Sequence, residues 1–213
     1  MLLYYITDRT QFAGDEVSRR AAVLHKIAEA ARCGVDFIQL RERDLSGREL
    51  EVLARDAVRA VRDNSSHTQL LINARTDVAI AGGADGVHLR SSDVKPSEAR
   101  AAWGLRSAAV ISVSCHSPGD VARAVAEMAD LAVLAPVFEK QGSSAVGLNV
   151  LRAACEYPIK ALALGGVTLE NARACTEAGA AGVAGIRLFQ ENDVAKVIEA
   201  LRGNDEIAYF QLS

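Results

Sequence analysis

AGGADGVHL, residues 81–89, is one of four similar stretches of this chain, and together they indicate its fold. The other three are RCGVDFIQL (32–40), EMADLAVL (127–134) and EAGAAGVAGI (177–186). Each passes from a helix-like segment through a short turn into an apolar run. The matching turn positions are Gly34, Gly83, Met128 and Gly179, spaced 49, 45 and 51 residues apart. That spacing corresponds to about two strand–helix units, which predicts eightfold alternation of strands and helices.

Eight short apolar runs of strand length lie along the chain. They are apolar almost throughout, as is typical of strands that a parallel sheet buries on both faces. The predicted strands are residues 2–7, 37–41, 69–73, 86–89, 109–114, 131–137, 159–164 and 182–186. An open doubly wound sheet would also alternate, but TDRTQF (7–12) replaces its usual GxGxxG turn. We therefore predict an α/β fold, a single (β/α)8 TIM barrel domain over residues 1–213.

The segments between these runs have helical periodicity. Residues 48–61 and 120–128 form amphipathic stretches, and the third and fourth helices are expected to be short. Ser46, Ser117 and Thr168 are expected to begin three helices. The core-facing stripe predicted for the first helix is Val17, Ala21, Leu24, Ile27, Ala28 and Ala31.

Composition narrows the class of protein. Half of the 213 residues are hydrophobic and 24% are charged, with a net charge of −3, as in ordinary globular proteins. Without a Lys/Arg cluster interleaved with aromatic residues, neither nucleic acid nor a membrane surface is an expected partner. No apolar run approaches the ~18 residues of a membrane span, and the start lacks a signal peptide's basic segment. Four cysteines without CxxC spacing predict reduced thiols and a cytoplasmic location. The oligomeric state is not readable from the sequence.

In a (β/α)8 barrel the site lies at the carboxyl ends of the strands. LLINART (70–76) is an apolar run that stops on Asn73. Because buried polar groups need partners, we expect Asn73 to face a pocket. The other polar or glycine positions at strand ends are Asp8, Gln39, Arg41, His88, Asp93, Ser114, His116, Lys140, Gly165, Gly166 and Arg187.

Two places along the chain suggest anion binding. LALGGV (162–167) and GVAGIR (182–187) follow the seventh and eighth strands, where such barrels often bind phosphate through backbone N–H groups. Arg187 would add a charge-assisted contact. The alternative is that the glycines only ease tight turns. Arg41 and Arg43, two residues apart on one strand face, form a second basic pair, with salt bridges to Glu42 or Asp44 as the alternative.

The acid, base and metal candidates each have a structural alternative. Asp93 is more often a helix cap, ahead of Pro96, than a metal ligand. His88 is either a core histidine with satisfied partners or a base at the barrel mouth. His116 is a general acid or base, a surface residue or part of a helix N-terminus. Cys115 is expected to be an inert thiol.

Several motifs resemble the thiamine phosphate synthase/TenI family over nearly the whole chain. They are YYITDR (4–9), FIQLRERDLSGREL (37–50), LLINARTDVAIAGGADGVHLRSSDV (70–94), SVSCHS (112–117), APVF (135–138) and LALGGVTLENA (162–172). The resemblance implies a (β/α)8 barrel of thiamine biosynthesis. Synthases of the family join a hydroxymethylpyrimidine diphosphate to a thiazole phosphate with Mg²⁺ and release pyrophosphate. TenI-type members share the thiazole-phosphate site, and some only aromatise that thiazole by proton transfer.

The resemblance also implies roles for individual residues. It makes Asp93 one Mg²⁺ ligand and places His88 beside the pyrimidine-diphosphate site. The positions of that site are Gln39, Arg41, Arg43, Asn73 and Ser114. The thiazole-phosphate positions are Gly166, Ile186 and Arg187.

Departures from the family pattern concern charge and acid–base groups. Ala74 stands where synthases have a metal-binding Asp, and Arg43 where they have Lys. EKQGSSAVG (139–147) replaces their threonine- and lysine-bearing loop and leaves Lys140 as its cation. Arg187 stands in place of a Ser. The tautomerase histidine of GHVF is Pro136 in this chain.

We therefore predict a barrel, most simply an enzyme, that binds thiazole phosphate or thiamine phosphate and is of the TenI thiazole tautomerase type. His116 or His88 would supply the acid or base, and Mg²⁺ would bind weakly, through Asp93, if at all. The expected partner is a small phosphorylated substrate. The first alternative is an active thiamine phosphate synthase. The second is a non-catalytic binding or regulatory protein that keeps the phosphate site.

Overall fold

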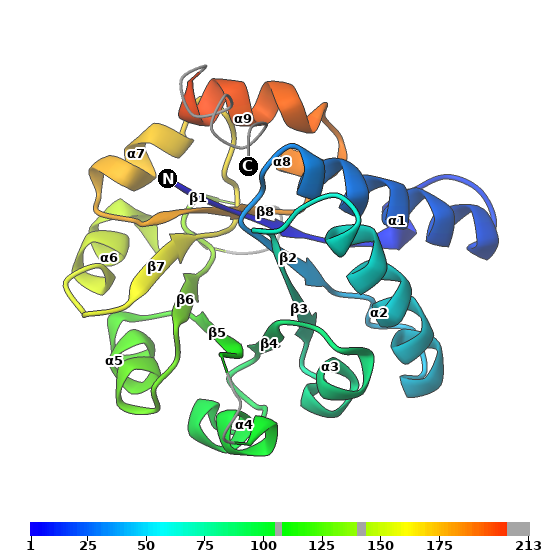
Figure 1. Cartoon of the computed structure of the whole chain (residues 1–213). Coiled ribbons are helices and arrows are strands. Elements are labelled where there is room, and N and C mark those ends of the chain that lie inside the picture. Colours follow the sequence, from blue (N-terminus) through cyan, green and yellow to red (C-terminus); the bar gives the residue numbers. More distant parts are fainter. Residues whose placement is uncertain (105–107, 140–143, 204–213) are drawn as a thin grey trace.

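The computed structural model describes residues 1–104, 108–139 and 144–203. Eight parallel strands close into a barrel in chain order, since β1 pairs with both β2 and β8 (Figure 1). The predicted (β/α)8 barrel is confirmed. The strands are β1 Leu2–Ile6, β2 Phe37–Leu40, β3 Gln69–Asn73, β4 Gly86–Leu89, β5 Val110–Cys115, β6 Leu131–Leu134, β7 Lys160–Ala163 and β8 Gly182–Gly185.

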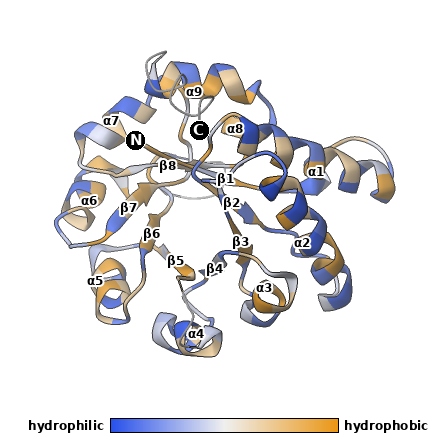
Figure 2. Ribbon diagram, viewed as in Figure 1, coloured by the Kyte–Doolittle hydropathy of each residue, from blue (hydrophilic) through white to orange (hydrophobic). Residues whose placement is uncertain are grey.

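Helices surround the barrel on the outside (Figure 1). Hydrophobic residues run along the strands, whereas the helices mix hydrophobic and hydrophilic positions (Figure 2). In the described ranges no helix is both long and apolar enough to cross a membrane. The helices are η1 Arg9–Gln11, α1 Glu16–Arg32, α2 Gly47–Arg62, α3 Thr76–Gly82, α4 Pro96–Trp103, α5 Pro118–Ala126, α6 Gly147–Ala154, α7 Ala172–Glu177, α8 Arg187–Gln190 and α9 Val194–Arg202.

The four repeated junctions share one backbone conformation. Their turn positions all have positive φ, at 89° for Gly34, 73° for Gly83, 60° for Met128 and 100° for Gly179. Glycine adopts this region without steric cost, whereas other residues adopt it with strain. The repeat seen in the sequence therefore reports a left-handed turn that leads into each even-numbered strand.

An aspartate follows three of these turns by two residues, just before the even-numbered strand begins. Its carboxylate accepts a hydrogen bond from a backbone N–H of the preceding odd-numbered strand, which fixes the entry to the next strand. The pairs are Asp36 with Leu3 at 2.6 Å, Asp85 with Leu70 at 2.8 Å and Asp130 with Ile111 at 2.7 Å.

Met128 is the one non-glycine residue among these four turns, and the residue is 59% exposed. Met128→Gly should raise the free energy of unfolding by about 1 kcal/mol, because glycine removes the left-handed strain and little packing is lost. Urea unfolding followed by circular dichroism measures this change. Met128→Ala is the control, since it removes the same side chain but keeps the Cβ. Equal stabilisation by alanine would contradict the strain argument.

Two of the three predicted helix starts are confirmed. The hydroxyl of Ser46 accepts from Glu49 N in a capping box, and that of Ser117 accepts from Asp120 N. The start predicted at Thr168 is wrong, because α7 begins only at Ala172. The N–H of Thr168 instead donates to the Asn171 side chain at 2.8 Å, so the loop after β7 is longer than predicted.

The stripe predicted for α1 is partly wrong. Val17 is 77% exposed and Ala21 is also exposed. The buried stripe of α1 therefore begins only at Val23. The residues that α1 does bury are Val23, Ile27, Ala30 and Ala31.

The barrel interior has a polar half and an apolar half. Its apolar cluster is separate from the layer between strands and helices. It consists of Tyr4, Ile6, Phe37, Leu71, Leu131, Val133, Leu162 and Ala184. Side chains alternate along a strand, so residues two positions from these face inward as well. On β2 to β5 the next inward positions are polar, and they are Gln39, Asn73, His88, Ser112 and Ser114.

Candidate active site

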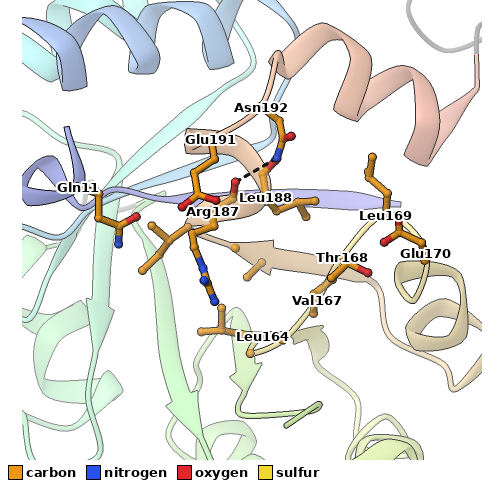
Figure 3. Close-up of a pocket in the computed structure, with 15 residues that line it drawn as sticks. Gln11, Leu164, Val167, Thr168, Leu169, Glu170, Arg187, Leu188, Glu191 and Asn192 are labelled. Carbon is orange, nitrogen blue, oxygen red and sulfur yellow. Dashed lines mark hydrogen bonds between the residues drawn. The ribbon is translucent and has the colours of Figure 1, made fainter. Parts of the chain in front are cut away.

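A cavity of about 480 Å³ opens between the loop after β7 and the start of α8 (Figure 3). Gly165 and Gly166 line it, with φ of 92° and 65°. A Cβ on Gly165 would lie 2.7 Å from Pro136 Cα, and one on Gly166 would lie 2.8 Å from Phe138 Cβ. Glycine is therefore required at both positions by the left-handed backbone and by close packing against the segment after β6.

Arg187 is the first residue of α8, and its side chain extends toward Leu164 across the mouth (Figure 3). Ile186 also lines the cavity, as do the carboxylate-bearing Glu170 and Glu191. The structure thus brings the predicted phosphate positions Gly166, Ile186 and Arg187 into one cavity.

Sequence reasoning missed Gln190, which fixes α8 to the first strand. Its Oε1 accepts from the Tyr5 hydroxyl at 3.0 Å and from Asp8 N at 3.1 Å, and its Nε2 donates to Asp8 O at 2.8 Å. The side chain is buried. Gln190 therefore fixes the helix that carries Arg187. A single glutamine in a short helix gives no sequence signal of such a role.

On the polar half of the barrel, Gln39 and Asn73 form a pair. Gln39 Nε2 donates to Asn73 Oδ1 at 2.9 Å. Gln39 is 1% exposed, and its Oε1 is buried without a hydrogen-bond partner within the described ranges. A buried amide oxygen of this kind has an unmet need for a donor. Asn73, the last residue of β3, thus lies beside a buried amide, and its role in a pocket stays a prediction.

His88 is a buried histidine with partners on both ring nitrogens. Nδ1 lies 2.9 Å from Ser112 Oγ and 3.4 Å from the Tyr4 hydroxyl, and Nε2 lies 2.8 Å from Ser114 Oγ. Burial, together with the charge of Arg41, lowers the pKa of His88 to about 4. The ring is therefore neutral at pH 7, which favours the core interpretation. Ser112 was missed, although it lies two residues before Ser114 on the same strand face.

His116 differs from His88 in both exposure and bonding. It is exposed, and its Nδ1 lies 2.7 Å from Ala135 O. A carbonyl only accepts, so Nδ1 carries the proton and Nε2 of the neutral ring has a free lone pair. Ala135 precedes Pro136, which packs against Gly165. His116 thus contacts the segment after β6, which in turn packs against Gly165 at the cavity between the loop after β7 and α8.

Arg9 is a second residue that sequence reasoning missed. It is 3% exposed and binds Asp44 through Nη1 at 2.6 Å and Nη2 at 2.9 Å. Glu42 accepts from both the backbone N and Nη1 of Arg9, at 3.0 Å and 3.3 Å. The alternative salt bridges of Arg41 and Arg43 with these carboxylates are therefore wrong. The prediction of one strand face is also wrong, because β2 ends at Leu40.

With this geometry established, comparison with known proteins identifies the family. The sequence profile described as thiamine monophosphate synthase matches residues 3–189. The chain belongs to this family. A Methanoculleus marisnigri thiamine-phosphate synthase is 37% identical over 214 residues, covering 97% of this chain and 95% of the relative. A Geobacter sulfurreducens relative, whose assignment as a thiamine-phosphate synthase is provisional, is 42% identical over 187 residues, covering 85% and 83%.

A solved structure has a similar architecture. Thiamine phosphate pyrophosphorylase from Pyrococcus furiosus superposes with a TM-score of 0.80 at 28% identity, covering 100% of this chain and 97% of that one. The family resemblance read from the sequence motifs is confirmed. The assignment to thiamine biosynthesis holds at the level of the thiamine monophosphate synthase family.

The family implies Mg²⁺, but the donor set at this mouth does not fit a resident ion. Ala74 has no side-chain oxygen, and both carboxylate oxygens of Asp93 are bound by Arg90, through the backbone N to Oδ2 and Nη2 to Oδ1, each at 2.7 Å. Burial alone would raise the pKa of Asp93, but the hydrogen bonds from Arg90 outweigh it and lower that pKa. Across the described residues, no group of three His, Cys, Asp or Glu could hold a metal.

Two further predictions concern the same loops. The expectation that Asp93 caps the helix ahead of Pro96 is wrong, since Lys95 is the N-cap of α4 and Asp93 closes a turn with Arg90 instead. Lys140 lies outside the described residues.

Proposed function

We propose that this chain is an enzyme of thiamine biosynthesis that binds a thiazole phosphate, or thiamine phosphate, with the phosphate in the β7–β8 cavity. The cavity formed by Gly165, Gly166 and Arg187 carries this proposal. Glycine-rich backbone lets N–H groups approach an anion closely, and a guanidinium adds charge-assisted hydrogen bonds. Relatives named thiamine-phosphate synthase support a substrate or product that bears a phosphate.

Arg187→Ala should weaken the binding of thiazole phosphate by about tenfold to a hundredfold, because hydrogen bonds to charged groups contribute ~1.5–3 kcal/mol. Isothermal titration calorimetry measures the affinity. Arg173→Ala is the matched control, since its side chain is 88% exposed on α7. An unchanged affinity for Arg187→Ala would remove this residue from the site.

The reaction we propose at this site is proton transfer on the bound thiazole, with His116 as acid or base. Nε2 of its neutral ring carries the lone pair, because Nδ1 faces the carbonyl of Ala135. His88 is a weaker candidate, since Ser112 and Ser114 occupy its nitrogens and its pKa is about 4.

His116→Asn should lower kcat for thiazole tautomerisation by ~10²-fold or more, as is typical of a lost general acid or base. Absorbance at the thiazole band follows the reaction. His25→Asn on the exposed face of α1 is the control and should leave the rate unchanged. Full activity of His116→Asn would exclude this assignment, and loss in a His88 variant instead would name the alternative base.

The polar half of the barrel favours a second candidate, an active thiamine phosphate synthase. A tautomerase of thiazole phosphate alone would leave Gln39 Oε1 unpaired, whereas a synthase would place its pyrimidine diphosphate over Gln39 and Asn73. Release of pyrophosphate from both substrates, with and without Mg²⁺, separates the two. A protein that binds thiazole phosphate yet catalyses neither reaction would be the binding or regulatory protein.

A further inference from the structure

The residues just after β2 include a guanidinium, that of Arg41, which forms no ion pair with the described part of the chain. Arg41 is half-buried and, within the described ranges, its side chain has no hydrogen bond and no ion pair. The nearby carboxylates of Glu42 and Asp44 are bound to Arg9 instead. A half-buried guanidinium without a partner loses solvation, which a bound anion would restore.

Two further arginines act on this charge. β3 pairs with both β2 and β4, with Leu40 opposite Ile72 and Asn73 opposite His88, so the carboxyl ends of β2 and β4 flank that of β3. Arg90 directly follows β4 at this end of the barrel. Burial and the charges of Arg43 and Arg90 lower the pKa of Arg41, against the opposing charges of Asp8 and Glu42. The arginines after β2 and β4 therefore converge on one region.

Of the two positions that would bind a divalent cation there, one has no side-chain oxygen and the other is hydrogen-bonded to an arginine. Ala74 offers no oxygen, and its backbone N donates to His88 O at 2.7 Å. Asp93, whose side chain is only 9% exposed, uses both oxygens to hold Arg90. A guanidinium thus lies beside the carboxylate that would be a metal ligand.

We propose that this mouth binds the diphosphate group of an organic diphosphate without a divalent cation, with Arg41 and Arg90 supplying the positive charge. Planar guanidinium forks match phosphate oxygens in bidentate fashion, so the site fits this class of anion. Asp93 binds Nε and Nη2 of Arg90 and offsets part of its charge. The proposal rests on the proposed function, which places a phosphorylated ligand at the same barrel mouth. It adds that arginines, rather than a metal ion, balance the charge of a second anion, the diphosphate.

Calorimetry with inorganic pyrophosphate in the presence of EDTA tests the proposal. The wild-type chain should bind the probe, and Arg41→Gln and Arg90→Gln should each weaken binding by about tenfold or more. The Arg90 side chain is 56% exposed, so its replacement leaves folding intact. Arg173→Gln is the control and should bind as the wild type does. Binding that requires added Mg²⁺, or that neither variant weakens, would overturn the proposal.

Asp93→Asn distinguishes the arginine site from a metal site by the sign of its effect. An arginine site loses a negative charge near the anion, so pyrophosphate affinity in EDTA stays the same or increases. A metal site loses its ligand, so Mg²⁺-dependent binding disappears, which would overturn the proposal.

Failure of the metal-free diphosphate site can be distinguished from failure of the proposed function. Thiazole-phosphate affinity should depend on Arg187 and not on Arg90. If pyrophosphate binding depends on Arg187 alone, the probe occupies the β7–β8 cavity and the metal-free site is refuted while the proposed function stands. If the Arg41 and Arg90 variants weaken pyrophosphate binding but thiazole phosphate does not bind the wild type, the proposed function fails and the metal-free site stands.

Discussion

Gly86→Ala and Gly182→Ala are each expected to lower the free energy of unfolding by about 3–5 kcal/mol, at the upper end of what one added methyl group does. A Cβ on Gly86 would lie 2.0 Å from Val110 O, and one on Gly182 would lie 1.9 Å from Leu2 O. Both oxygens belong to the backbone of the neighbouring strand. No side-chain rotation relieves the overlap, so the paired strands must separate.

Urea unfolding of the purified variants measures this loss, and failure to accumulate as folded protein would be its extreme form. Gly119→Ala is the matched control, because its Cβ would meet only Ser117 Oγ at 3.7 Å. Gly119 lies in α5, where alanine should stabilise by ~0.5–1 kcal/mol. A loss below about 1 kcal/mol for both barrel glycines would mean that the strands part more easily than their hydrogen bonds suggest.

The barrel was predictable because its information is local and repeated. The turns at Gly34 and Gly83 indicate where the next strands begin. The predicted strands at residues 69–73 and 86–89 match the structure at both ends. The sixth strand was predicted to reach residue 137 but stops at Leu134. Pro136 lies within the overshoot and has no N–H to donate to the ladder.

The site was predictable only in part, because ion pairing depends on which loops meet in space. Position at a strand end was enough to single out Gln39 and Asn73, which bond to each other, and Arg187, which lines the cavity. It did not reveal that Arg9 takes the carboxylates beside Arg41, or that Arg90 takes Asp93. Hydrophobic periodicity reports which face is buried and carries no information about how charges on different loops are paired.

The unmodified chain is expected to bind Mg²⁺ weakly or undetectably and to release pyrophosphate from the two synthase substrates far more slowly than an intact family site. Ala74 replaces a metal carboxylate, and the loop after β6 lacks the family's lysine. Two missing charge partners at ~2–4 kcal/mol each would slow the step by several orders of magnitude. Manganese titration by electron paramagnetic resonance measures metal binding, and a coupled pyrophosphate assay measures the rate.

Ala74→Asp should strengthen metal binding together with Asp93. It should restore the joining of the two synthase substrates only partly, because the lysine is still missing. The backbone accepts this change, since φ at Ala74 is 62° and Asp adopts the left-handed region more readily than Ala. Ala74→Asn is the matched control, with the same shape and no charge. Adding Arg90→Gln should increase metal affinity further, because it releases both oxygens of Asp93. Robust Mg²⁺-dependent synthesis by the unmodified chain would refute this account, and Lys140 would then be the cation that completes a working diphosphate site.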